Sequence, residues 1–204
     1  MTDSIPRLTS VYENRRLARA SQGDIYGEVQ VLEQAVPDNR TTTYGYATVL
    51  TQDCDLEQDW DAHKKVSERG GGLTDADKYL RHLILAPCYV LEQFLGGTHI
   101  GGRAMKKWPR KEFENYVRDD KHVRYHCLPS HGEYGVPDLV VDFKHYFSIE
   151  RDAFYSGTKQ QASYICSLGL LHRQALAQRF ASYLSRVGIP SPQETGVESE
   201  GSRF

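Results

Sequence analysis

The residues with the most chemical potential lie where an apolar, β-branched run at 46–51 stops at a polar string, Gln-Asp-Cys-Asp, at 52–55. The run predicts a β-strand, because β-branched and aromatic side chains favour that conformation. A polar string directly after a strand is typical of a reactive or binding group presented at the edge of a sheet. The rest of the chain is therefore expected to supply sheet partners around this corner.

Cys54 could act as a nucleophile if a nearby histidine lowered the pKa of its thiol. His126 and His145 lie on predicted strands that could be its neighbours. The carboxylates of Asp53 and Asp55 work against this role, because like charges disfavour a thiolate. The competing interpretation is a partly buried cysteine whose two flanking aspartates cap the following turn.

The same corner could instead hold a divalent metal ion between Asp53, Cys54, Asp55 and a histidine from another strand. No CxxC or HxxH pair supports such a site, and the four cysteines are far apart in the sequence. We therefore expect no cofactor, and we keep a metal or thiol site at this corner as an alternative.

Residues 103–124 form the strongest candidate for a nucleic-acid contact. This stretch holds eight lysines and arginines against four acids, within a chain whose formal charge is −2. Aromatic rings interleave with the cations, a combination that can stack bases while neutralising phosphates. The alternative is a solvated helix whose aromatic residues point inward. The predicted binding residues are Arg103, Lys106, Lys107, Trp108, Arg110 and Lys111, joined by Lys144 from a later strand.

Arg124 and His126 share one side of a strand expected at 123–128, because side chains alternate along a strand. They could work together as a phosphate clamp and a general base. Lys144 and His145 would be natural companions. The predicted catalytic residues are Cys54, Asp55, Arg124, His126 and His145.

Composition places the chain among ordinary globular proteins, with 25% charged and 39% hydrophobic residues in 204. Its weak negative charge argues against a protein that coats nucleic acid with its whole surface. The N-terminus lacks an apolar signal core, and no apolar run is long enough to cross a membrane. A cytoplasmic protein with reduced thiols follows as the expectation, and a homodimer stays open.

The periodicity predicts a mostly β domain at 23–188, preceded by an N-terminal arm at 1–22 with a short helix at 11–20 and followed by a disordered tail at 189–204. Charged insertions are expected at 55–80, with little core value, and at 92–122. Strands are expected at 24–33, 41–51, 83–86, 123–128, 138–143, 145–150 and 163–167. Helices are expected at 88–95, after Pro109 with Phe113, Tyr116 and Val117 inward, and at 170–187 with Arg173 on the outer side.

Four segments occur in an order that resembles the MazF/PemK-like toxin barrels. They are Gly-Asp-Ile-Tyr at 23–26, Thr-Val-Leu-Thr-Gln-Asp at 48–53, Leu-Ile-Leu-Ala-Pro at 83–87 and Ser-Ile-Glu-Arg-Asp-Ala-Phe at 148–154. The likeness covers roughly 23–55, 82–90 and 123–154. It implies a small SH3-like antiparallel barrel, closed here by a long C-terminal helix, and a protein that binds or cleaves RNA without metal in a toxin or phage-defence setting, with an antitoxin or other protein as a partner.

The chain departs from that family at its catalytic positions. The arginine of the family's Arg-Thr-Ile-Asp strand corresponds to Phe147 here, and the hydroxyl residue after the proline corresponds to Cys88 or Tyr89. A phenyl ring has neither charge nor donors with which to stabilise a phosphorane. A non-catalytic nucleic-acid or protein interaction module on the same barrel is therefore the alternative.

Overall fold

The computed structural model describes residues 10–33, 40–69, 76–156 and 162–186. The expected tail at 189–204 lies outside the described residues. Eight strands make one antiparallel sheet in the order β1-β8-β2-β3-β4-β6-β5, with β7 also paired to β4. The strands are β1 (Tyr12–Glu13), β2 (Asp24–Glu33), β3 (Arg40–Val49), β4 (His82–Val90), β5 (Tyr125–Leu128), β6 (Leu139–Asp142), β7 (Phe147–Glu150) and β8 (Ser163–Leu168).

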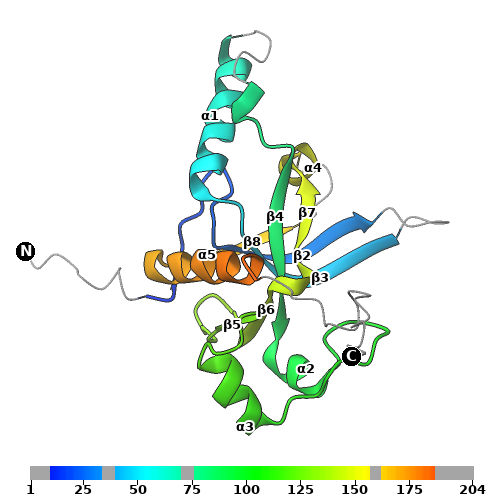
Figure 1. Cartoon of the computed structure of the whole chain (residues 1–204). Coiled ribbons are helices and arrows are strands. Elements are labelled where there is room, and N and C mark those ends of the chain that lie inside the picture. Colours follow the sequence, from blue (N-terminus) through cyan, green and yellow to red (C-terminus); the bar gives the residue numbers. More distant parts are fainter. Residues whose placement is uncertain (1–9, 34–39, 70–75, 157–161, 187–204) are drawn as a thin grey trace, which may run out of the picture.

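Within the described ranges, five α-helices and three short turns connect or cover the strands (Figure 1). The α-helices are α1 (Asp53–Arg69), α2 (Leu91–Gly96), α3 (Arg110–Phe113), α4 (Arg151–Tyr155) and α5 (Leu170–Leu184). The short turns are the 3₁₀ turns η2 (Ala76–Lys78) and η4 (Phe143–His145) and the π-helical turn η3 (Glu114–Arg118). The expectation of a mostly antiparallel β protein with helical insertions is confirmed, and the sheet curls into a half-barrel.

β4 is the central strand, and it continues through the proline that was expected to end it. Its first half pairs with β7, at Leu85 with Phe147, and its second half pairs with β6, at Cys88 with Val141. Pro87 falls between these two ladders, where η4 interrupts the neighbouring strand. Proline has no N–H to donate, and it is tolerated at this position because no backbone carbonyl on the β6 and β7 edge of β4 needs a hydrogen bond from residue 87. The helix expected at 88–95 therefore starts only at Leu91.

The charged insertion after the Cys54 corner is not an exposed excursion, as the sequence suggested, but the helix α1. Leu56 and Ala62 on its inner face are buried, and so is Asp59. The Asp59 carboxylate accepts hydrogen bonds from Arg151 Nε at 2.9 Å and from the Leu80 amide at 2.9 Å. A narrow stripe of buried side chains is enough to anchor a helix whose other faces are charged. The high average polarity of this segment therefore led to a wrong prediction.

Two more expectations need correction at the ends of the sheet. The arm forms no helix at 11–20; instead Tyr12 pairs with Leu168 of β8 and buries its ring. After Pro109, α3 widens into the π-helical η3. Phe113 and Val117 point inward as expected, but Tyr116 is 55% exposed. The wider turn changes which side chains share a face.

The C-terminal helix α5 packs against the sheet through Leu176, which is fully buried, and through Phe180, whose ring centre lies 5.6 Å from that of Phe143. Arg173 does not lie on the outer side, as the sequence suggested, but is 8% exposed. Its guanidinium Nη1 lies 3.7 Å from Asp53 Oδ2. The helix thus joins the Cys54 corner to the core.

Candidate functional site

A pocket of about 230 Å³ opens between the loop after α2 and the segment that leads into β5. The first loop contributes Lys106 and Trp108, and the second contributes His122 and Arg124. The loop geometry depends on Gly97, whose φ is +70° and where a Cβ would lie 2.5 Å from the Met105 carbonyl oxygen. The described lining residues are His99, Met105, Lys106, Trp108, His122, Arg124 and Tyr125.

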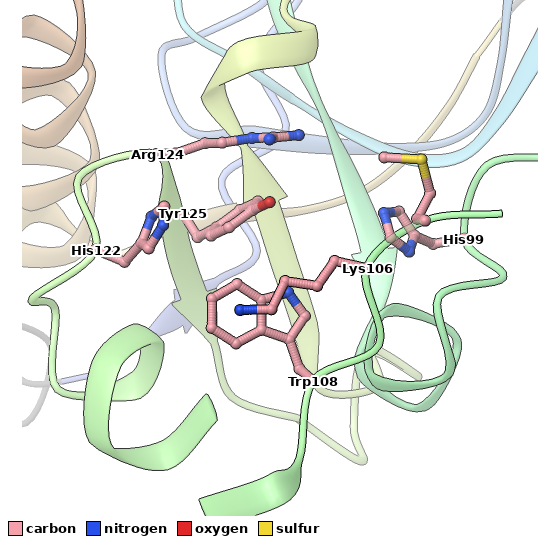
Figure 2. Close-up of a pocket in the computed structure, with 7 residues that line it drawn as sticks. His99, Lys106, Trp108, His122, Arg124 and Tyr125 are labelled. Carbon is pink, nitrogen blue, oxygen red and sulfur yellow. The ribbon is translucent and has the colours of Figure 1, made fainter. Parts of the chain in front are cut away.

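Aromatic rings form the floor of this pocket. Trp108 is 8% exposed and Tyr125 is 6% exposed. Lys106 Nζ lies 3.7 Å from the centre of the Trp108 ring, a cation–π contact that covers one face of the indole. Figure 2 shows Lys106 lying across Trp108, with Tyr125 between the two histidines. Trp108 therefore supports the pocket floor, and its role is not that of a free stacking platform.

Arg124 is held by a buried carboxylate behind the pocket. Its Nε and Nη2 atoms donate to the two oxygens of Asp142 at 2.7 and 2.6 Å, and His145 Nδ1 lies 2.9 Å from Oδ2. Burial alone would raise the pKa of Asp142, but the hydrogen bonds from Arg124 and His145 outweigh it and lower the pKa to about 2. Two of the three guanidinium nitrogens of Arg124 are engaged in this pair, which leaves Nη1 for a ligand.

Each permanent cation of the pocket thus has a carboxylate partner. Lys106 Nζ lies 2.8 Å from Glu112 Oε1 at the surface. Arg124 pairs with Asp142, whose carboxylate is buried. None of the described lining residues is acidic. An anion entering the pocket would therefore meet Lys106 and Arg124, with no acidic side chain among the described lining residues.

His99 and His122 stand on opposite sides of the pocket (Figure 2). The Nδ1 atoms of both rings are buried without a hydrogen-bond partner among the described residues. Burial lowers the pKa of both imidazoles, and for His122 the nearby Arg124 and Lys106 lower it further. Both rings are accordingly neutral near pH 7 and able to accept a proton.

The Cys54 corner is a separate place in the molecule. α1 and β5 lie at opposite ends of the sheet in Figure 1. The exposed thiol lies 3.7 Å from Gln52 Oε1 and 3.6 Å from Asp55 Oδ1. Among the described residues, no contact joins Cys54 to Arg124, His126 or His145. The structure thus does not bring the five predicted catalytic residues together.

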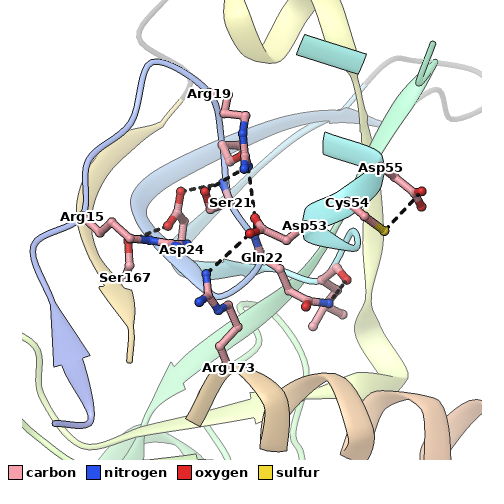
Figure 3. A network of polar contacts seen from close by, with 12 residues as sticks. Arg15, Arg19, Ser21, Gln22, Asp24, Asp53, Cys54, Asp55, Ser167 and Arg173 are labelled. Carbon is pink, nitrogen blue, oxygen red and sulfur yellow. Dashed lines mark hydrogen bonds and ion pairs between the residues drawn. The ribbon is translucent and has the colours of Figure 1, made fainter. Parts of the chain in front are cut away.

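Asp53 belongs to a structural network rather than to a reactive centre (Figure 3). Its Oδ1 accepts hydrogen bonds from Arg19 Nη1 at 3.1 Å and from the Gln22 amide at 3.2 Å. Burial would raise the pKa of Asp53, but the hydrogen bond and charge of Arg19, the Gln22 amide and the charge of Arg173 together outweigh it, so the pKa is lowered. These contacts tie the start of α1 to the N-terminal segment.

Of the other predicted residues, His126 is buried beside Asp120, with 3.6 Å between Nδ1 and Oδ1. Arg110 pairs with Glu92 at 2.6 Å. The Lys144 amide donates to Asp142 Oδ1 at 3.0 Å, while its side chain is exposed. The remaining predicted cations, Arg103, Lys107 and Lys111, are exposed and are not among the described lining residues of the pocket.

Sequence reasoning missed His99 and His122. His122 sits within the basic stretch and could have been included on charge alone, since a histidine beside arginine and lysine has a lowered pKa. His99 follows a diglycine turn, and its place in the pocket depends on packing against Tyr89 and Phe94, whose ring centres lie 4.7 and 4.9 Å from that of His99.

In the described ranges, no group of three or more histidine, cysteine or acidic side chains is arranged to hold a metal ion. Within the same ranges, none of the helices has the length and apolar character needed to cross a bilayer.

Comparison with known proteins finds no relative of this chain. The chain matches no protein-family model, no curated protein and no solved structure.

Proposed function

We propose that this protein binds single-stranded RNA, with one backbone phosphate seated in the pocket lined by Lys106, His122 and Arg124. The observation that carries the proposal is the lining itself: two permanent cations, Lys106 and Arg124, two histidines and, among the described lining residues, no acid. Arg and Lys are the side chains that recognise phosphate, and Arg124 is oriented before the ligand arrives because Asp142 holds it.

The proposal extends to the fold family. The mostly antiparallel sheet that curls into a half-barrel supports the SH3-like barrel implied by the resemblance to MazF/PemK-like toxins. In such a setting, expression in a bacterial host would arrest growth, and variants of pocket residues would relieve that arrest.

Adjacent lysines offer a matched test of binding. Lys106 lines the pocket, whereas Lys107 is exposed beside it and is absent from the lining. We expect Lys106→Met to weaken binding of a short single-stranded RNA by about tenfold, measured by fluorescence anisotropy at fixed salt, because a phosphate contact is lost. Lys107→Met should leave the affinity within about twofold of the wild type. Equal losses in the two variants would contradict a pocket-centred interface.

Cleavage of the bound RNA is the second candidate function, favoured by the two neutral imidazoles on opposite sides of the pocket. One imidazole would accept the proton of a ribose 2′-hydroxyl as its oxygen attacks phosphorus. The bond from phosphorus to the 5′-oxygen breaks, the second imidazole, protonated when the anion is bound, gives its proton to the leaving oxygen, and a 2′,3′-cyclic phosphate and a 5′-hydroxyl result. Lys106 and Arg124 would stabilise the charge that develops on the phosphorane.

The cleavage step can be separated from binding. A substrate with 2′-O-methyl ribose should bind and resist cutting, and wild-type protein should yield 2′,3′-cyclic ends in the presence of EDTA. His122→Asn and His99→Asn should slow cutting by at least about a hundredfold, the usual contribution of a general acid or base. His82→Asn, at the exposed start of β4, is the control. Binding without any cutting would leave the non-catalytic interaction module as the function.

A further inference from the structure

The segment between η3 and β5, which carries His122 and Arg124, is held in place by a side chain from α5. Arg179 donates hydrogen bonds to the carbonyl oxygens of Asp120 at 3.0 Å, His122 at 3.0 Å and Tyr125 at 2.6 Å. Its Nη1 also lies 3.2 Å from the Asp120 carboxylate. The guanidinium of Arg179 therefore links the start of the segment at Asp120, its middle at His122 and its end at Tyr125.

This segment needs external support because its own backbone offers little. Asp120 has φ of +58°, in the left-handed region that residues other than glycine seldom adopt. Hydrogen bonds within the segment are few, the amide of Tyr125 to the His122 carbonyl at 3.2 Å being one. Contacts with His126 and Arg179 lower the pKa of the Asp120 carboxyl, so it stays charged and keeps its ion pair with Arg179.

We propose that Arg179 is a positioning residue for the pocket, which sets the placement of His122 and Arg124 without touching the ligand. The inference rests on the proposed function in so far as those two side chains meet RNA. An arginine suits this role because its planar fork can donate to several fixed carbonyl oxygens at once, whereas the ammonium group of a lysine is a point charge without that geometry.

Arg173 on the same helix provides a matched control. Its side chain is 10% exposed and Arg179's is 16% exposed, and each guanidinium pairs with an aspartate, Asp53 or Asp120. Replacing either with methionine keeps most of the stem and removes the fork. Each variant removes one mostly buried guanidinium that pairs with an aspartate, but only Arg179→Met should disturb the pocket.

The experiment compares wild type, Arg179→Met, Arg179→Lys and Arg173→Met. Affinity for a short single-stranded RNA is measured by anisotropy, and the pKa of His122 is measured by NMR titration of the imidazole signals without RNA. We expect Arg179→Met to weaken binding by about tenfold and to raise the His122 pKa toward its ordinary value, because a loosened segment exposes the ring. Arg179→Lys should not restore either property, and Arg173→Met should retain both.

Wild-type affinity and an unchanged His122 pKa in Arg179→Met would overturn the inference. Full rescue by Arg179→Lys would also overturn it, since charge and not the fork would then be sufficient. Equal effects in Arg173→Met would reduce the role to general helix stability and so refute it. If the wild type binds no RNA, the proposed function fails, and the His122 titration still decides the role of Arg179.

Discussion

Arg124→Met should destabilise the fold strongly, because it leaves the Asp142 carboxylate buried without its main partner. Asp142 is 0% exposed and Arg124 is 19% exposed. Breaking a buried pair by removing one member costs about 3–5 kcal/mol. His145 remains 2.9 Å from the carboxylate and can share the charge when protonated, so we expect the lower end, about 3 kcal/mol.

The pH dependence gives an independent estimate of the same interaction. The pKa of Asp142 is lowered from 3.8 to about 2, and one pKa unit corresponds to about 1.4 kcal/mol, so the native contacts of the carboxylate contribute about 2.5 kcal/mol at neutral pH. Because the native pKa lies below the unfolded value, this stability is present above about pH 4 and is lost as the pH falls toward 2. In Arg124→Met the acid-side loss should shrink.

Urea unfolding at pH 7 and pH 3 measures both effects. Arg118→Met is the control, because its ion pair with Glu114 is exposed and should contribute less than about 1 kcal/mol. The double variant Arg124→Met/Asp142→Asn should recover part of the loss, since it removes the uncompensated charge. A loss at pH 7 below about 1 kcal/mol in Arg124→Met, or an unchanged acid-side slope, would refute the reasoning.

Four further predictions follow from single features of the structure. Burial raises the pKa of Asp24 to about 6, so the stability of the wild type should decline as the pH rises from about 4 through 6, and Asp24→Asn should flatten that part of a pH series of urea unfolding curves. Leu56→Ala should cost about 2–5 kcal/mol in chemical unfolding, because Leu56 is fully buried; Leu184→Ala, at a position 54% exposed, should change stability little. Among the four free cysteines, Cys54 should react with a thiol reagent in the folded protein, whereas Cys88 and Cys166 should react only after unfolding. An anion in the pocket favours protonated His99 and His122, so binding of inorganic phosphate, followed by calorimetry, should take up protons and strengthen as the pH falls below neutral.

Sequence alone determined the elements with strong local signals. Alternation and β-branched content predicted the strand at 24–33 with its observed bounds, and the strand expected at 163–167 differs by one residue from Ser163–Leu168. The long C-terminal helix expected at 170–187 is observed at Leu170–Leu184. These signals are local, because each depends on the spacing of side chains along one element.

The tertiary structure alone decided the site. Lys106, Trp108 and Arg124 were predicted from charge and aromatic content, but their meeting with His99 and His122 depends on how two loops fold over β5 and α2. Cys54 and Asp55, equally attractive in the sequence, stand apart from them. Asp142 and Arg179 carry no motif at all, since their importance comes from burial and from partners that are far away in the chain. The sequence gives the residue types in order, but the distances between functional side chains are set by the packing of segments that are far apart in the chain.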